Sequence, residues 1–272
     1  MLIGGNTLNR FTFMRWRHRE LLLALIEREV TGRYRGSIAG LLWSFLNPLL
    51  MLLVYTFVFS VVFKVRWDTG SDSKSQFALL VFTGMMVFNL FSECISRAPG
   101  LIPSNANYVK KVVFPLDLLP GVILGAVLFH TLVSFIVWLI FHLLVFGLPP
   151  FTTLLFPLVL LPLVLFTLGL SWFLASLGVY LRDISQVIGV LMSALMLLSA
   201  VFYPVSALPA AYQHWLYLNP LTLVIESSRD VLIWGVVPDI SLWLGQLVGA
   251  SVVAFLGHAW FEKTRQGFAD VL

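Results

Sequence analysis

The chain carries little charge. Asp, Glu, Lys and Arg make up 11% of its 272 residues, whereas hydrophobic residues make up 59%. A soluble domain is normally about one quarter charged, because its surface must be hydrated. So few charges cannot cover a water-facing surface, and the composition therefore predicts a protein that is surrounded largely by lipid. A net charge of +4 is too small to indicate a nucleic-acid partner, and none is expected.

Cysteine and the common catalytic motifs are also scarce. Cys94 is the single cysteine, which excludes an intramolecular disulfide and a cysteine-based metal cage. The sequence has no G-x-x-x-x-G-K-S/T phosphate loop, no H-E-x-x-H metal motif and no G-x-S-x-G nucleophile motif. We therefore expect this chain to hold no catalytic residue, no metal and no cofactor of its own.

Ionisable side chains are nearly absent from the middles of the apolar stretches, where ion-coupled transporters usually carry them. Glu93 and Arg97 lie one helical turn apart near the end of a stretch, which favours an interfacial ion pair. His130, with Ser134 one turn later, is typical of a hydrogen bond across helices rather than of a proton relay. The sequence therefore disfavours a secondary transporter.

The chain is rich in long apolar stretches. A helix needs about 20 apolar residues to cross a bilayer. Six stretches qualify, and they cover residues 40–63, 77–94, 118–146, 154–180, 187–203 and 241–261. They predict an all-α, polytopic membrane protein with six transmembrane helices in a single domain over residues 1–272.

Lysine and arginine are distributed unevenly between the connections. If both termini lie in the cytoplasm, all but four of the 17 basic residues fall on the inner side, as the positive-inside rule requires. The sequence therefore predicts a multi-pass protein of the plasma (inner) membrane. Its parts are a cytoplasmic amino-terminal region (1–38), a six-helix bundle (40–261) and a cytoplasmic tail (262–272).

Residues 19–31 have a helical pattern with one apolar and one charged face. The apolar face holds Leu22, Leu23, Ile26 and Val30, and the charged face holds Glu20, Glu27 and Arg28. This pattern predicts an amphipathic helix that lies in the inner membrane interface before the first span. Residues 97–115 form a second cytoplasmic segment.

The exterior segment 204–238 is too long for a simple turn and too apolar for a free loop. We expect short re-entrant helices in the outer leaflet, because backbone at that depth must satisfy its hydrogen bonds internally. Asn219-Pro220 predicts a break between two helices. Glu226 and Arg229 are expected to pair on the second helix, with Asp230 as an alternative partner. Asn219, Pro220, Glu226 and Arg229 are thus candidates for an exterior gate, and a fixed lid is the alternative.

Several motifs follow one another in a specific order. The longest reads EREVTGRYRGS from Glu27 and continues as GLLWSFLNP from Gly40. The later motifs are YVKKVVFPLD from Tyr108, LRDI from Leu181, LNPL from Leu218 and FADVL from Phe268. In this order and spacing, and over nearly the whole chain, the sequence resembles the permeases of ABC exporters that move lipid-linked polysaccharides, including O-antigen and teichoic acid exporters.

The resemblance implies partners as well as a fold. Such permeases have six helices, an amphipathic helix before the first, and short re-entrant helices between the fifth and sixth. They act as homodimers, and each subunit binds a separate cytosolic ATPase, which holds ATP and Mg. The substrate is a glycan on a lipid carrier, and membrane lipids surround the protein.

Two sets of residues are candidates for coupling to the ATPase. The resemblance makes the amphipathic helix, with Glu20, Glu27 and Arg28, the docking element, although membrane anchoring is an alternative. The second set lies in the segment 103–111 and comprises Asn105, Asn107, Lys110 and Lys111. For the two lysines, attraction to anionic lipid is an equal alternative.

Arg33 and Arg35 lie where the chain turns into the first span. Guanidinium groups bind phosphate bidentately, so these residues are candidates for the substrate phosphate, with ordinary topological charge as an equal alternative. Phe45, Tyr55, Phe59 and Phe63 fall roughly along one face of the first span and are candidates for a channel on which sugars stack, whereas ordinary packing is the default. Gly245 and Gly249 predict close helix packing.

Two other functions remain open. The same permease plan suits export of a capsule or teichoic acid polymer, a drug or a lipid. A membrane enzyme that acts on lipid-linked sugars should carry acidic or histidine clusters at the membrane surface, and the sequence pattern indicates none.

Overall fold

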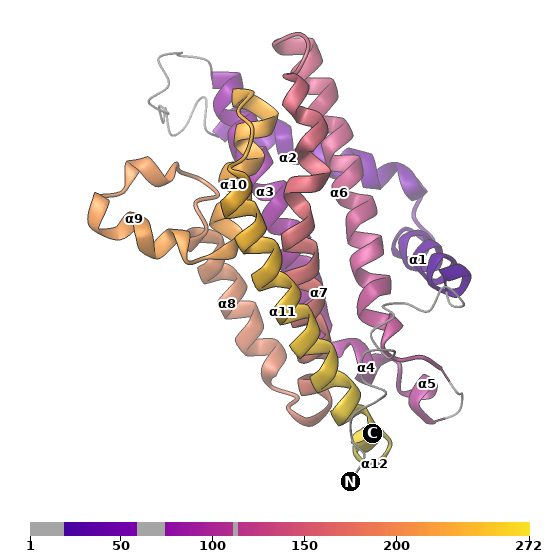
Figure 1. Ribbon diagram of the computed structural model, residues 1–272. Coiled ribbons are helices and arrows are strands. Elements are labelled where there is room, and N and C mark those ends of the chain that lie inside the picture. Colours follow the sequence, from indigo (N-terminus) through magenta and orange to yellow (C-terminus); the bar gives the residue numbers. More distant parts are fainter. Residues whose placement is uncertain (1–18, 59–73, 111–113) are drawn as a thin grey trace.

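The computed structural model describes residues 19–58, 74–110 and 114–272, and every regular element in this part of the chain is a helix (Figure 1). The all-α prediction is therefore confirmed for these residues. Five segments are long and apolar enough to cross a membrane, namely Gly40–Phe57, Ser75–Ser104, Leu118–Val145, Phe151–Tyr180 and Ile240–Val271. They correspond to the first four and the last of the six predicted spans, and they make the chain a multi-pass membrane protein.

The bundle is built from five long helices and the turns that lead into them. They are α2 (Trp43–Phe57) after η3 (Gly40–Leu42), α3 (Lys74–Arg97), α6 (Leu118–Val145), α7 (Phe156–Tyr180) after η6 (Phe151–Leu155), and α11 (Ile240–Thr264). Of these, α3 is the most buried. It packs against α2, α6 and α7, and α7 packs in turn against α11 (Figure 1).

A close helix contact joins α7 and α11 through glycine. A Cβ atom on Gly257 would lie 2.0 Å from the Gly169 carbonyl oxygen, and one on Gly169 would lie 2.6 Å from the Cα atom of Ala254. Only residues without side chains allow two backbones to approach so closely. A Cβ on Gly245 or Gly249 would meet no atom of the described chain within 4 Å. The prediction that these two glycines support close packing is therefore wrong within this part of the chain.

The predicted fifth span, residues 187–203, is shorter as a helix than the sequence suggests. It forms α8 (Ile184–Leu198), whose 15 residues extend about 22 Å at 1.5 Å per residue. The helix ends because its last carbonyls have side-chain partners: Ser199 Oγ donates to the Leu195 carbonyl at 2.6 Å, and Tyr203 Oη donates to the Leu197 carbonyl at 2.7 Å. Ala200 then takes a left-handed φ of 53°. Six uninterrupted long spans are thus not confirmed.

Two short helices follow at this end of the bundle. After η7 (Val205–Ala207), the chain forms α9 (Ala210–Tyr217) and α10 (Pro220–Arg229), and α10 continues into the π-helical turn η8 (Asp230–Trp234). Asn219 begins α10, because its side chain accepts a hydrogen bond from the Leu221 N–H at 3.0 Å and Pro220 occupies the first helical position. The predicted break at Asn219-Pro220 is confirmed.

The amino-terminal helix α1 (Arg19–Arg33) packs beside α6 (Figure 1). Its buried side chains are Leu22, Leu25 and Val30, whereas Leu23 is 63% exposed. Leu23 therefore does not belong to the packed face, and Leu25 takes its place. Counted from Leu22, the face continues three, four and eight residues later at Leu25, Ile26 and Val30, which is the spacing of one side of a helix.

At the end of the bundle where α3 stops, several short elements gather. They are η5 (Ala98–Gly100), α4 (Leu101–Ser104), α5 (Ala106–Lys110), η9 (Arg265–Gly267) and α12 (Phe268–Val271). Phe268 is fully buried and its ring lies 5.5 Å from that of Phe261. We call this end the basic end, because Arg97, Lys110 and Arg265 lie there. The buried aromatic ring ties the carboxyl terminus to the bundle.

Candidate functional site

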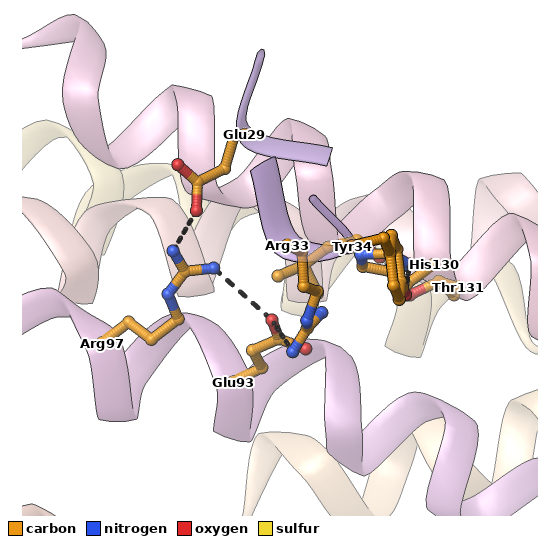
Figure 2. A network of polar contacts seen from close by, with 8 residues as sticks. Glu29, Arg33, Tyr34, Glu93, Arg97, His130 and Thr131 are labelled. Carbon is orange, nitrogen blue, oxygen red and sulfur yellow. Dashed lines mark hydrogen bonds and ion pairs between the residues drawn. The ribbon is translucent and has the colours of Figure 1, made fainter. Parts of the chain in front are cut away.

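Two charged residues of α1 and two of α3 form one ion-pair network (Figure 2). Glu93 Oε1 lies 2.9 Å from Arg33 Nη2 and 3.5 Å from Arg97 Nη1. Arg97 also pairs with Glu29. The predicted pair of Glu93 and Arg97 is therefore confirmed, while its partners from α1 were not predicted. Two guanidinium groups face two carboxylates, so the network has no net charge.

Tyr34 extends this network towards α6. Its hydroxyl lies 3.5 Å from His130 Nδ1, and the two rings meet edge to face (Figure 2). Burial raises the pKa of Tyr34 above its ordinary value. The predicted hydrogen bond of His130 thus has a partner in the turn after α1 rather than in a neighbouring span.

A pocket of about 380 Å³ lies between α2, α3 and α6, with Arg33 and Tyr34 in its wall. Its apolar wall includes Met51, Tyr55 and Phe82. A second hollow of about 500 Å³ adjoins it and shares Arg33 and Glu93. The polar wall of the first pocket consists of Ser44, Asn47, Asn89, Ser92, Glu93, Ser96, His130, Thr131 and Ser134. So many polar groups among apolar spans are typical of a ligand path.

The structure places the predicted phosphate and channel residues differently from one another. Arg33 and Tyr55 both line the pocket. Arg35 is exposed in the turn after α1 and is not part of the pocket wall. Phe45 is half-buried against the hydrophobic core rather than in this pocket. Phe59 and Phe63 lie outside the described residues, so their placement stays a prediction.

The two candidate docking segments come together at the basic end. Arg28 Nη1 donates to Tyr108 Oη at 3.0 Å, which joins α1 to α5. Glu20, Glu27 and Asn107 are exposed. Asn105 donates from its side chain to the Leu101 carbonyl at 2.9 Å, and Lys110 ends α5, whereas Lys111 lies outside the described residues. We call the polar residues of these two segments, which the bond between Arg28 and Tyr108 joins, the docking surface.

Arg229 is the most buried charge of the candidate exterior gate. It is 1% exposed, and its Nη1 lies 2.7 Å from Glu226 Oε1, which confirms the expected pair. It also donates to the carbonyls of Ala200 at 2.9 Å, Val201 at 2.6 Å and Leu80 at 3.3 Å. Sequence reasoning missed these backbone partners, although an arginine within an apolar segment is a signal for them.

One group of side chains in the described residues could hold a metal ion. Asp117, which precedes α6, lies near His258 and Glu262 of α11, and their ligand atoms are within 4.8 Å of one another. The spacing of His258 and Glu262, one helical turn, is the only sequence signal for this group. Glu262 also pairs with Arg265 at 2.9 Å, and the His258 ring lies against Trp172. Glu262 and His258 thus have ordinary structural partners, and we assign the group no function.

Comparison with known proteins places the whole site within one family. The model of the ABC-2 type transporter family matches residues 20–233, a range that contains the ion-pair network, the pocket and Arg229. The chain is 29% identical to the O-antigen export system permease protein RfbA of Myxococcus xanthus, over 94% of this chain and 96% of the relative. It is 25% identical to the protein of the same name from Klebsiella pneumoniae, over 93% and 95% of the two chains.

A third relative is a transport protein with a different name. The chain is 26% identical to the polysialic acid transport protein KpsM of Escherichia coli, over 89% of this chain and 92% of the relative. The sequence resemblance to ABC exporter permeases is therefore confirmed at the level of the family. With most of its length matched, the chain belongs to the ABC-2 type transporter family and is a membrane permease rather than an enzyme.

Proposed function

We propose that this chain is the membrane subunit of an ATP-driven exporter that moves a lipid-linked, O-antigen-like polysaccharide out of the cytoplasm. The single observation that carries this proposal is the match to an O-antigen export permease over 94% of the chain. A separate cytosolic ATPase binds ATP and Mg, and a second copy of the chain completes the transporter. The basic end and both termini then face the cytoplasm of a plasma (inner) membrane.

Arg33 is the residue that we assign to the phosphate of the lipid carrier. It lies at the pocket, and its pair with Glu93 is partly exposed, so the pair is weak enough to exchange. An incoming phosphate accepts two hydrogen bonds from the guanidinium and displaces the carboxylate. Glu93 keeps Arg97 as a partner after that exchange. Arg35, outside the pocket wall, then serves as topological charge.

The docking surface is the part that we assign to the ATPase. Glu20, Glu27 and Arg28 of α1 and Asn105, Asn107 and Lys110 of α5 lie on or beside it, and Lys111 is assigned with them from the sequence. The hydrogen bond between Arg28 and Tyr108 supports this assignment, because it lets α1 and α5 move together. Since α1 also carries Arg33, motion of the docking surface reaches the pocket directly.

We assign α8 to the fifth of six crossings, and α9 with α10 to a re-entrant pair at the outer end of the bundle. The buried hydrogen bonds of Arg229 favour the interpretation of this segment as a fixed lid rather than as a moving gate. Each opening of a gate would break several of these bonds at once. Export of a capsule polysaccharide is the second candidate, since the polysialic acid transport protein is a similar relative.

Glycan profiling of a deletion strain tests the proposal. Loss of the gene should remove the polymer from the cell surface and leave lipid-linked glycan in the cytoplasmic leaflet, and the intact gene should restore export. A normal surface polymer in the deletion strain, with no glycan accumulated inside, would contradict the proposed function.

A further inference from the structure

We propose that the pocket wall around Asn47 and Asn89 is a binding subsite for an uncharged sugar, the one that follows the phosphate of the lipid-linked substrate. The inference rests on the proposed function and deepens it, because it assigns the sugar-binding part of the same substrate path. Asn47 comes from α2 and Asn89 from α3, and both line the pocket that also contains Arg33.

The two asparagines are exposed where their neighbours are not. Asn89 is exposed although Phe88 and Leu90 beside it are buried, and α3 is the most buried of the long helices. Asn47 is likewise exposed, on a helix whose hydrophobic residues pack or face lipid. Neither side chain forms a hydrogen bond to any residue that the structure describes. Because both amides line the pocket and have no partner among the described residues, both are available to a polar ligand.

Three hydroxyl groups of the wall already have backbone partners. Ser44 Oγ donates to the Leu41 carbonyl at 2.7 Å, and Thr131 Oγ1 donates to the Val127 carbonyl at 3.0 Å. Ser134 Oγ donates to the His130 carbonyl at 2.9 Å. Each of the two amides offers a donor and an acceptor at once, as do the hydroxyls of Ser92 and Ser96 in the same wall. Sugar hydroxyls also donate and accept, which makes them complementary to an amide pair.

The charges around the pocket favour an uncharged sugar over an acidic one. Arg33 and Arg97 are matched by Glu93 and Glu29, so the network has no spare cation. Once a phosphate takes Arg33, a carboxylate on the next sugar would face Glu93 without a partner. The half-buried ring of Tyr55 in the same wall offers a surface for the apolar face of a sugar ring.

Binding of defined probes to the full-length permease in lipid nanodiscs tests the subsite. The probes are farnesyl diphosphate alone, the same molecule with one N-acetylglucosamine, and the same molecule with one glucuronic acid. The native chain should bind the N-acetylglucosamine probe about fivefold or more tightly than bare farnesyl diphosphate, as one added hydrogen bond allows. The glucuronic acid probe should gain nothing.

Substitutions of single residues show which side chains cause the preference for the N-acetylglucosamine probe. Asn47→Ala and Asn89→Ala should each reduce the preference for the N-acetylglucosamine probe while leaving the affinity for bare farnesyl diphosphate unchanged. Gln186→Ala, which removes an exposed amide at the start of α8, should leave every affinity unchanged. Equal binding of the three probes, tighter binding of the glucuronic acid probe, or unchanged preference in both asparagine variants overturns the subsite alone. Failure of the native chain to bind any probe contradicts the proposed function as well.

Discussion

Arg229 holds together three parts of the molecule that are distant in sequence. Its guanidinium connects Glu226 of α10 with the Ala200 and Val201 carbonyls that follow α8 and with the Leu80 carbonyl of α3. Those carbonyls have no water to replace the arginine in a buried site, so its loss leaves them and Glu226 without a partner. Arg229 therefore decides whether the end of the bundle that holds α9 and α10 folds as described.

Removal of this side chain should be strongly destabilising. We expect Arg229→Met to cost about 3–5 kcal/mol of folding free energy, because a buried pair is broken on one side. Arg265→Met is a matched control, since Arg265 pairs with Glu262 at the same three-residue spacing but is 43% exposed, and it should cost about 1 kcal/mol or less. Thermal unfolding in detergent measures both. Similar midpoints for the two variants would contradict the role given to Arg229.

Arg33 and Arg35 provide a comparison at the pocket. Both carry the same charge, yet only Arg33 lines the pocket. We expect Arg33→Gln to reduce glycan export about tenfold or more, because a charge-assisted phosphate contact is worth about 1.5–3 kcal/mol. Arg35→Gln should leave export nearly unchanged. Export assays in the deletion strain, with equal membrane levels of each variant, measure this. Equal losses of glycan export in both variants would mean that the total positive charge before the first span matters, and not the position of Arg33 in the pocket.

At the scale of elements, the contact between α1 and α5 should couple the permease to its ATPase. Charge reversal at Glu27 and Arg28 removes complementary charges from the docking surface and breaks the bond to Tyr108. We expect ATPase activity that the substrate no longer stimulates, with the permease still inserted. Charge reversal at Arg182 and Asp183, which are exposed after α7 at the same end, serves as the control. Normal stimulation in the first double variant would exclude α1 as the coupling element.

The contact between α7 and α11 gives a second test at this scale. Gly257→Leu places a side chain where a Cβ atom alone would lie 2.0 Å from a backbone carbonyl, so the two helices must separate. Overpacking of this kind costs about 1–3 kcal/mol or more. At Gly245 on the same helix a Cβ atom would meet no described atom within 4 Å, so Gly245→Leu should leave the thermal midpoint unchanged. If Gly245→Leu is the more destabilising variant in detergent, the packing of α11 described above is wrong.

The positions of most helices could be predicted because each is a local property of the sequence. An apolar run of sufficient length predicts a helix, and an Asn-Pro pair predicts a helix boundary, without reference to any other part of the chain. The end of α8 was not predicted, because an apolar run does not show that Ser199 and Tyr203 will bond the last helix carbonyls. The segment that follows is held by Arg229, which reaches back 28 residues to Val201. The roles of the glycines could not be predicted either. Gly245 and Gly257 are both glycines of α11 that follow a leucine, and only the structure shows that Gly257 lies against α7 whereas Gly245 does not.

The candidate site was predictable only in part. Arg33 was identified because guanidinium chemistry and its place before the first span are visible in the sequence. Asn47 and Asn89 were not, since each is an ordinary polar residue until α2 and α3 place both in one pocket. The link of Glu29 to Arg97 was missed for the same reason, because it joins residues 68 positions apart.

At the scale of the whole molecule, the permease supplies a path and its partner supplies free energy. The sequence has no phosphate loop, so the isolated chain should not bind ATP. The family match over residues 20–233 contains the ion-pair network, the pocket and Arg229. Export should therefore depend on both proteins together.

Transport in inverted membrane vesicles tests this central claim most directly. Vesicles that contain the permease and its partner ATPase should carry labelled lipid-linked glycan into the lumen when ATP is added. Vesicles with either protein alone, or with an ATPase variant that cannot hydrolyse ATP, should carry none. Transport by the permease alone, or transport driven by an ion gradient without ATP, would contradict the account.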